Sequence, residues 1–516
     1  MARYDVVVIG AGHNGLTAAC VLATAGRRVL VVERRDVLGG LCASEEFHPG
    51  YRTPGLLHDT AQVRPGVVEA LRLDQHGLDL VTPSPTLLAG PDGRGITLES
   101  SDDATAEDIA RTSQHDAERW RAYRAFIGRV RRVIEPLLND TPPDIGAIGS
   151  LQSGSLGTLL KSAMSFQKLG RREMAELLRV PPMCVADWMN EWFENDLLKA
   201  GLAHGALFGM WAGPWSPGTA ANLLLAECTA TSAVKGGAGA LAFALERAAR
   251  HLGVELRTGA TVDSIRMSGG AATGVVLASG EEIEAAAVAA SCDPRTLFLD
   301  LIPAGTLPVA FEHRTSVIRA RGTTAKVHLA LGARLEFAAK PGVRVERART
   351  ATTLDDLERA FDGVKYGQVS EHPVLDVHVP SVANPEMAPD GCDTVSLLVH
   401  FAPHALAGGW TDEARDRLGD AAVAALERVA PGAGRAIVGR EVLTPADIAA
   451  RYGVSGGHIH HCEHALDQLA IRPTLETMRY ATPIANLYLC GSGSHPGGGV
   501  TCAPGALGAA AVLSRR

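Results

Sequence analysis

The sequence lacks the features that mark secreted, membrane-spanning and nucleic-acid-binding proteins. Its nine cysteines are scattered and contain no C-x-x-C pair, so we expect neither a disulfide framework nor a cysteine-based zinc site. No apolar run reaches the roughly eighteen residues of a transmembrane helix. The net charge of −8 gives no reason to expect nucleic-acid binding. The first strand pattern begins almost at Met1, so we expect no signal peptide. Together these absences favour a cytoplasmic protein with reduced thiols.

Aromatic residues are also scarce, at 5% of the chain, yet four of the six tryptophans lie between positions 188 and 215. Large flat apolar side chains suit the wall of an apolar pocket, so Trp211 and Trp215 are candidate substrate-binding residues. A tryptophan cluster in the core is the alternative. Arginine greatly outnumbers lysine, and alanine and glycine are abundant, a composition typical of GC-rich bacterial genomes.

The most informative stretch is Tyr4 to Glu33. A short apolar strand, Asp5 to Ile9, leads into the turn Gly10-Ala11-Gly12-His13-Asn14-Gly15, and a small-residue helix and a second strand follow. In this G-x-G-x-x-G pattern the glycines allow a tight turn, a close approach of the backbone to a pyrophosphate, and close helix–strand packing. The helix N-terminus attracts phosphate, and Glu33 can accept hydrogen bonds from both ribose hydroxyls. The stretch therefore predicts an α/β, Rossmann-type dinucleotide-binding domain.

Two further motifs point to the identity of the dinucleotide. Gly39-Gly40 follows Glu33, and the strand Leu487 to Cys490 runs into Gly491-Ser492-Gly493-Ser494-His495-Pro496-Gly497-Gly498-Gly499-Val500. With these motifs the chain resembles FAD-dependent flavoproteins of the amine oxidase superfamily, especially the phytoene-desaturase-related branch. The resemblance spans nearly the whole chain and is weakest over residues 80–230 and 300–440. It implies FAD as the cofactor.

The resemblance also implies an interleaved arrangement of two domains. The FAD-binding domain would comprise residues 1–78, 231–300 and 451–516. Residues 79–230, which are rich in helix patterns, and residues 301–450 would build an α+β substrate domain. The cofactor-binding residues implied are Gly10, Gly12, Asn14, Gly15, Glu33, Arg34, Gly40, Leu41, Val262, Gly491, Ser492, Gly499, Val500 and Thr501.

The catalytic residues are less certain from sequence. His58, Glu227 and His495 could assist the departure of a proton, but no spacing requires any of them. His58 lies in a stretch that passes near the flavin in relatives; a surface or helix-capping histidine is the alternative. The cluster His458, His460, His461 and His464 has no partner spacing typical of a metal site, and we expect no metal.

The function expected is an FAD-dependent dehydrogenase or desaturase that transfers hydride from a substrate C–H bond to the flavin. The substrate would be an apolar or polyene-like small molecule, and oxygen or a quinone would reoxidise the flavin. An amine or amino-acid oxidase, a redox-neutral isomerase and a non-catalytic flavin-binding interaction protein are the alternatives. Helix patterns at 114–137 and 156–178 carry arginines and lysines beside apolar residues. A solvated face for the first helix and packing onto the domain for the second are the commoner explanations, and peripheral membrane contact is the alternative. A homodimer is a further alternative to a monomer.

Overall fold

The computed structural model describes residues 4–143, 169–469 and 471–514. Within these ranges no helix combines the length and apolar character that a membrane crossing requires. Of the helix pattern at 156–178, the described part is α6 (Arg171–Arg179), and the remainder lies outside the described residues.

The first of two large sheets is built around the N-terminal strand. Its parallel strands follow the order β9-β2-β1-β12-β18, and an antiparallel extension, β12-β11-β10, continues from β12. The strands are β1 (Tyr4–Ile9), β2 (Val29–Val32), β9 (Glu255–Arg257), β10 (Val262–Ser268), β11 (Ala271–Leu277), β12 (Glu282–Ala290) and β18 (Leu487–Leu489). The two ends of the chain thus share one sheet.

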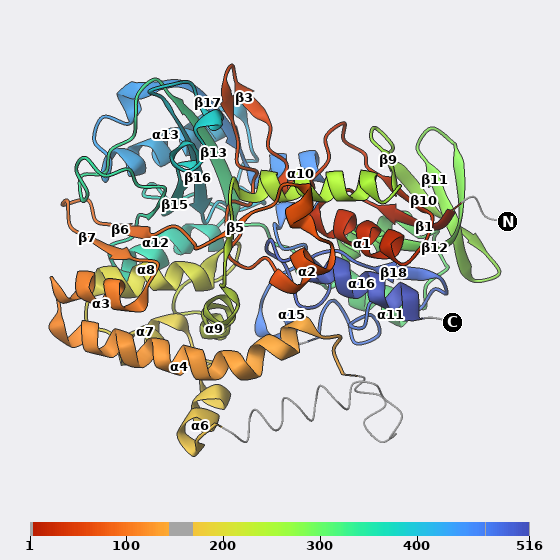
Figure 1. Ribbon diagram of the computed structural model, residues 1–516, viewed down its shortest axis with the longest axis horizontal. Helices are drawn as coiled ribbons and strands as arrows, with labels where there is room; N and C mark the ends of the chain where they lie inside the picture. Colours follow the sequence, from red (N-terminus) through yellow and green to blue (C-terminus); the bar gives the residue numbers. More distant parts are fainter. Residues whose placement is uncertain (1–3, 144–168, 470, 515–516) are drawn as a thin grey trace.

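Helices cover this sheet on one face, where they build an apolar core with it. These are α1 (His13–Thr24), α10 (Gly237–His251) and α16 (Ala503–Ser514). Figure 1 shows α1 and α16 side by side, so the first and last helices of the chain adjoin each other. The opposite face packs against a turn of π-helix at Thr296–Leu301 and α11 (Val309–Ser316). A parallel sheet buried on both faces explains the continuous apolar runs of β1 and β2.

The second sheet has the strand order β17-β13-β16-β15-β14-β6-β7. Its strands are β6 (Thr86–Ala89), β7 (Gly95–Leu98), β13 (Thr324–Leu331), β14 (Arg347–Arg349), β15 (Leu375–His378), β16 (Asp393–His400) and β17 (Ile437–Leu443). One face carries apolar residues that pack beneath α13 (Asp412–Glu427). The period-2 pattern over Thr324 to Leu331 and Thr394 to Phe401 predicts two strands, and β13 and β16 confirm both with nearly the same bounds.

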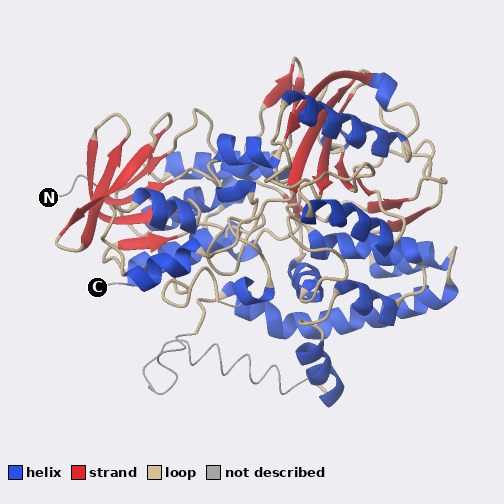
Figure 2. Cartoon of the chain, turned by 180° about the vertical axis from the view of Figure 1, so that it is seen from behind, coloured by secondary structure: helices blue, strands red, loops and turns tan. Residues whose placement is uncertain are grey.

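A layer of helices lies beneath the second sheet in Figure 1, and Figure 2 shows it from behind. It contains α3 (Asp102–Ala110), α4 (Gln114–Asn139), α7 (Val185–Trp192), α8 (Asp196–Leu207), α9 (Thr219–Thr229) and α12 (Leu354–Lys365). The residue pattern over 187–202 predicts a single helix, and this prediction is wrong. Two helices occupy that region because Asn195 caps α8, its side chain accepting from the Leu198 amide at 3.1 Å.

Short elements connect these layers. They are α2 (Pro65–Ala70), α14 (Pro445–Tyr452), α15 (Leu466–Leu469) and the strand pairs β3 (Glu46–His48) with β4 (Tyr51–Arg52) and β5 (Leu80–Val81) with β8 (Ala233–Val234). The β5–β8 pair ties residue 80 to residue 234, where the chain passes from the helical layer back to the first sheet.

Candidate functional site

A cavity of about 240 Å³, here called the dinucleotide cavity, opens where β1 ends and α1 begins. Nine of the fourteen predicted cofactor-binding residues line it: Gly10, Gly12, Asn14, Glu33, Arg34, Gly40, Leu41, Val262 and Ser492. They come from the end of β1 and the start of α1, the end of β2 and the 3-10 turn Gly40–Cys42, the start of β10, and the loop after β18. Because the carboxyl ends of parallel strands meet at one edge of a sheet, three distant parts of the chain reach one cavity.

The three fingerprint glycines have different surroundings. Gly10 adopts a φ of +92°, which favours glycine. A Cβ on Gly12 would meet no described atom within 4 Å and would project into open space beside the cavity. A Cβ on Gly15 would lie 2.0 Å from the Gly10 carbonyl oxygen, which is impossible without moving backbone. Gly15 therefore does not line the cavity but allows α1 to pack on the end of β1.

The Gly39-Gly40 pair closes the cavity from the other side. The Gly39 amide donates to the Ala11 carbonyl at 2.9 Å, and a Cβ on Gly40 would lie 3.0 Å from the Gly12 Cα. Both glycines have positive φ, +107° and +56°. Glycine is thus required at both positions, because the pair packs directly against the fingerprint turn and has positive φ angles.

Glu33 is 8% exposed at the floor of the cavity. Its carboxylate accepts from the Ala11 amide at 2.8 Å and from the Arg35 amide at 3.0 Å. These bonds fix the carboxylate at the tip of β2, where its remaining lone pairs can accept from two hydroxyls. The neighbouring Arg34 lies on the rim and donates to the Ala450 carbonyl at 2.6 Å.

Asn14 joins the two ends of the chain. Its Nδ2 donates to Ser492 Oγ at 3.0 Å, and its Oδ1 accepts from the Gly505 amide at 3.4 Å. A Cβ on Gly491 would lie 2.4 Å from the Ser291 carbonyl, so Gly491, like Gly15, serves close packing. The loop after β18 is thereby held against the N-terminus of α1.

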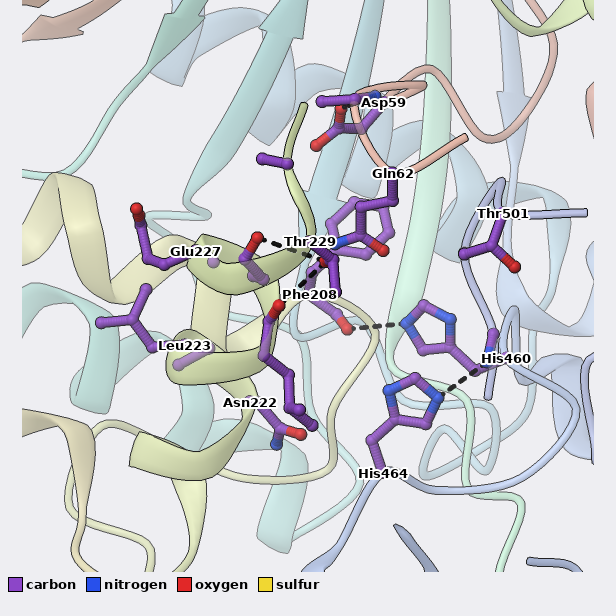
Figure 3. Close-up of a pocket in the computed structure, with 18 of the residues that line it drawn as sticks. Asp59, Gln62, Phe208, Asn222, Leu223, Glu227, Thr229, His460, His464 and Thr501 are labelled. Carbon is purple, nitrogen blue, oxygen red and sulfur yellow. Dashed lines mark hydrogen bonds between the residues drawn. The ribbon is translucent and has the colours of Figure 1, made fainter. Parts of the chain in front are cut away.

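A second cavity of about 210 Å³, the central cavity, lies between the first sheet's loops and the helical layer. Figure 3 shows residues from α9 facing the C-terminal loop across it. Many of its lining side chains are apolar: Leu57, Leu138, Leu202, Phe208, Met210, Leu223, Leu225 and Leu469. Gly499, Val500 and Thr501, the remaining predicted cofactor residues, line this cavity.

Two stacked histidines support the loop that carries these residues. His460 and His464 have ring centroids 4.3 Å apart and planes 16° apart. The Gly498 amide donates to His464 Nε2 at 3.0 Å, and His460 Nε2 lies 3.0 Å from the Phe208 carbonyl (Figure 3). A carbonyl only accepts, so His460 Nε2 carries the proton. Burial lowers the pKa of His460 to about 4, which keeps it neutral.

Sequence reasoning assigned this pair no role beyond its exclusion from a metal site. Among the described residues no group of three or more histidine, cysteine or carboxylate side chains is arranged to hold a metal ion. A Cβ on Gly498 would lie 2.4 Å from His460 Nδ1. The histidine spacing and the glycine run are therefore parts of one packed unit.

The face of the second sheet opposite α13 is polar although it is buried. Side chains alternate between the two faces of a strand, and this face carries Lys326 and His328 from β13, Asp376 and His378 from β15, and Ser396 and His400 from β16, each at most 5% exposed. Buried polar groups are costly unless they are bonded or face a ligand. This polar face is directed toward the central cavity, since Asp376 and Arg349 are part of the cavity wall.

A chain of three residues runs through this face. Lys326 Nζ lies 2.8 Å from His58 Nδ1, and His58 Nε2 lies 3.2 Å from Asp376 Oδ1. Burial lowers the pKa of Lys326 to about 7 and that of His58 to about 3. Burial alone would raise the pKa of Asp376, but the His58 hydrogen bond and the Arg349 charge hold it well below its usual range.

The three predicted catalytic residues therefore differ in placement. His58 is buried and reaches the cavity only through Asp376, which lines it. Glu227 lines the cavity, but its carboxylate accepts from Arg124 Nη1 at 2.5 Å. The His495 ring bonds the Leu137 carbonyl at the end of α4, 3.0 Å away, and is not in the described cavity wall. Lys326 and Asp376 were missed because no motif accompanies them.

The two predicted substrate-binding tryptophans do not lie in the described wall of the central cavity. The Arg321 guanidinium carbon lies 3.8 Å from the centroid of the Trp211 ring. The same ring packs edge-on against Phe361. Trp215 is 40% exposed. Trp188 and Trp192 join the apolar cluster around Tyr123. Trp188 and Trp192 are therefore core residues, because α7 directs them toward α4. Phe208 and Met210, which precede Trp211 in the chain, line the cavity instead.

The comparisons with known proteins agree with this geometry. Residues 8–61 match the NAD(P)-binding Rossmann-like domain, and residues 149–512, more than half of the chain, match the flavin containing amine oxidoreductase family. The chain belongs to the flavin containing amine oxidoreductase family. It is an FAD-dependent oxidoreductase with a Rossmann-type fold.

Three curated relatives match over nearly the full chain. The pyridine nucleotide-disulfide oxidoreductase domain-containing protein 2 of Rattus norvegicus is 35% identical over 98% of this chain and 92% of the relative. A limonene dehydrogenase component of Castellaniella defragrans is 29% identical over 96% and 92%. A phytoene desaturase (neurosporene-forming) of Cereibacter sphaeroides is 26% identical over 99% and 93%. Because the relatives come from both rodents and bacteria, they do not decide the bacterial origin suggested by composition.

Solved structures show the same fold. Putrescine oxidase bound to putrescine aligns with a TM-score of 0.59 at 15% identity, covering 99% of both chains. Cyclohexylamine oxidase from Brevibacterium oxydans aligns with a TM-score of 0.57 at 15% identity, also covering 99% of both.

The residues present fit FAD. The open space beside Gly12 would take a pyrophosphate, the fixed Glu33 carboxylate would take a ribose, and Val262 would lie beside the adenine. The Gly499 to Thr501 loop, which precedes the N-terminus of α16, lies in the wall of the next cavity and would face the ring. FAD would therefore be held by residues of both cavities, its phosphates and ribose by the dinucleotide cavity and its ring by the wall of the central cavity.

Proposed function

We propose that the protein is an FAD-dependent dehydrogenase or desaturase that removes hydrogen from a C–H bond of an apolar, unsaturated small molecule. The observation that carries the proposal is the aliphatic lining of the central cavity, from Leu57, Leu202, Leu223 and Leu225, beside the loop that would face the flavin. The names of two relatives, a limonene dehydrogenase component and a phytoene desaturase, describe unsaturated hydrocarbon substrates of those proteins.

Bound FAD would supply the acceptor for the hydride, and the protein must then bind the substrate, exclude water and take up the second hydrogen as a proton. The aliphatic wall serves the first two tasks. For the third, Asp376 contacts the cavity and His58 links it to Lys326. Neutral Lys326 is the final proton acceptor in this scheme. His58 must first change from the tautomer whose Nε2–H donates to Asp376 to the tautomer protonated at Nδ1. It then receives at Nε2 the proton taken at Asp376 and gives its Nδ1 proton to Lys326 Nζ, which restores the first tautomer.

This route keeps protons and charge in balance. Before the reaction the chain of three residues holds an ionised Asp376, a neutral His58 and a neutral Lys326. Afterwards Asp376 is ionised and His58 neutral again, and Lys326 carries the added proton. The histidine is positioned to change tautomer because each ring nitrogen faces one partner. These contacts give His58 a relay role that requires no direct contact with the substrate.

An amine oxidase is the second candidate, because the fold is shared with putrescine oxidase and cyclohexylamine oxidase. A protonated amine would need a free carboxylate. In the described part of the cavity wall each carboxylate is paired with arginine: Asp59 with Arg347, Glu227 with Arg124 and Asp376 with Arg349. This pairing favours the dehydrogenase. Reoxidation by oxygen or a quinone and a cytoplasmic location with peripheral membrane contact complete the proposal.

Anaerobic titration of the purified flavoprotein tests the two candidates. We expect limonene or a short polyene to bleach the oxidised flavin, and putrescine and cyclohexylamine to leave it unchanged. Bleaching by the amines alone would overturn the dehydrogenase proposal in favour of the oxidase. Retention of the oxidised spectrum with every compound would favour the non-catalytic flavin-binding role.

A further inference from the structure

Two helices that wall the central cavity carry buried polar atoms without a partner among the described residues. His204 on α8 is 1% exposed, and both of its ring nitrogens are in this state. Asn222 on α9 is 8% exposed, and the unpartnered atom is its Oδ1. Both residues line the cavity. Nearly all buried polar groups in folded proteins are bonded, so these two require an explanation.

The two helices meet at these positions. A Cβ on Gly205 would lie 3.3 Å from Leu223 Cδ1, and these residues directly follow His204 and Asn222. Figure 3 shows the Asn222 amide beyond the α9 ribbon, on the side where His464 lies. His204 and Asn222 therefore stand beside the point where α8 and α9 touch in the cavity wall.

The surrounding charges are balanced. Arg349 Nη1 donates to the Gly201 carbonyl at 2.8 Å, one turn before His204, and the Arg349 guanidinium pairs with Asp376. Burial and the adjacent His400 lower the pKa of His204 well below its usual range, so the ring is neutral. It offers one N–H donor and one bare nitrogen, while Asn222 Oδ1 offers an acceptor.

Other unpartnered atoms in the described wall have a different setting. Arg349 Nε has no hydrogen-bond partner among the described residues, but it lies 3.4 Å from Asp376 Oδ2 in an ion pair. Arg64 Nε and His460 Nδ1 are also without a partner among the described residues, but the Arg64 amide donates to the Thr501 carbonyl and His460 packs on Gly498. These two residues adjoin the loop that would face the flavin, so their free atoms carry no information about the substrate.

We propose that the substrate carries a hydroxyl group on its apolar skeleton and that His204 and Asn222 bind this group. The inference rests on the proposed dehydrogenase function and narrows its substrate class. A hydroxyl can accept from the imidazole N–H while it donates to Asn222 Oδ1. A hydrocarbon satisfies neither atom, a carboxylate has no proton to donate to Asn222, and an ammonium cannot accept from His204.

The first test measures folding, with no ligand needed beyond bound FAD. His204→Leu removes two ring nitrogens, and Asn222→Leu removes an Oδ1, that have no partner among the described residues, so each variant should unfold at a temperature at least as high as the wild type. Thr219→Val on α9 is the matched control. Its hydroxyl is fully bonded, donating to the Ser216 carbonyl at 2.7 Å and accepting from the Val185 amide at 2.8 Å, so this variant should unfold at a lower temperature.

A fall in the unfolding temperature of both leucine variants, comparable to that of Thr219→Val, would overturn the proposal. It would mean that His204 and Asn222 support the fold, directly or through ordered water.

The second test measures binding with limonene and perillyl alcohol, which share one carbon skeleton and differ by a hydroxyl. Perturbation of the flavin absorbance under anaerobic conditions reports the dissociation constants before turnover. We expect the alcohol to bind at least about tenfold tighter to the wild type, and the ratio to fall to about one in His204→Leu and Asn222→Leu.

Equal affinity for both compounds in the wild type, or an unchanged ratio in the variants, would overturn the proposal. If neither compound perturbs the flavin, the unfolding measurement decides. The first test measures folding and the second measures binding, so neither requires turnover. A protein that binds the alcohol but never reduces its flavin would contradict the dehydrogenase function and leave the hydroxyl site supported.

Discussion

The two large sheets of this protein build their cavities in different ways. The first sheet offers mainly backbone: Gly10 and Gly40 shape the dinucleotide cavity, and Glu33 is the side chain fixed at its floor. The second sheet offers side chains, with Lys326 and Asp376 on its buried polar face. A cofactor common to many enzymes can be held by a fixed backbone frame, whereas a substrate requires chemistry specific to each enzyme.

This difference also decides how each half tolerates substitution. Substitution of a glycine in the first sheet's turns causes steric overlap, which is local and involves identifiable pairs of atoms. A polar network fails when one partner is removed, because the others remain buried and unbonded. The predictions below use substitutions that separate these two kinds of failure.

The largest effects are expected in the glycine frame, where two neighbours should fail differently. Gly15→Ala places a methyl 2.0 Å from the Gly10 carbonyl oxygen and should destabilise the fold by about 3 kcal/mol or more. Gly12→Ala meets no described atom within 4 Å and should fold normally while losing bound FAD. Urea unfolding followed by circular dichroism, with flavin content after gel filtration, measures both. Full FAD occupancy in Gly12→Ala would contradict the assignment of the cavity.

The next effect concerns the proton acceptor on the second sheet. Lys326→Met should slow anaerobic flavin reduction about 10²-fold or more. Because the pKa of Lys326 is lowered to about 7, its neutral form is abundant above that pH. The wild-type rate should therefore rise as the pH increases through about 7, and the variant should lose this rise. Stopped-flow reduction from about pH 6 to about pH 9 measures it, and the same rise in Lys326→Met would exclude the lysine.

A smaller effect is expected when the middle of the polar chain is removed. His58→Leu leaves Lys326 and Asp376 buried without their bridge and should cost about 2 kcal/mol of folding free energy. His58→Gln, which can keep one of the two hydrogen bonds, should cost less. Urea unfolding of the two variants gives the comparison; equal stability of His58→Leu and wild type would show that the chain is not formed.

The smallest effect is expected for Glu227→Gln. The carboxylate is paired with Arg124 at the partly exposed edge of the cavity, and such pairs contribute about 1 kcal/mol or less. Flavin reduction should therefore change by less than about threefold at every pH. A loss comparable to that of Lys326→Met would instead make Glu227 the proton acceptor and contradict the role given to the polar face.

Sequence reasoning reached the first sheet well and the second sheet poorly. The fingerprint predicted β1, α1, β2 and the cavity residues between Gly10 and Glu33, because close helix–strand packing and backbone approach demand glycine at fixed spacings. The resemblance to flavoproteins, and not a spacing rule, implied Gly40, Leu41, Val262 and Ser492. Trp211 and Trp215 were chosen for their size and rarity, yet neither is in the described cavity wall. The local concentration of a rare residue type indicates a cluster of large side chains. It does not indicate the direction in which the backbone points those side chains.

The sequence by itself determined the fingerprint part of the dinucleotide site, since Gly10 to Glu33 is continuous in the chain and each glycine answers a steric requirement visible in the motif. Only the tertiary structure decided the second site. Lys326, His58 and Asp376 lie far apart in the chain, and His204 and Asn222 are ordinary helix residues until two helices meet. Strand pairing and helix packing bring these side chains together, and such long-range contacts leave no fixed spacing in the sequence.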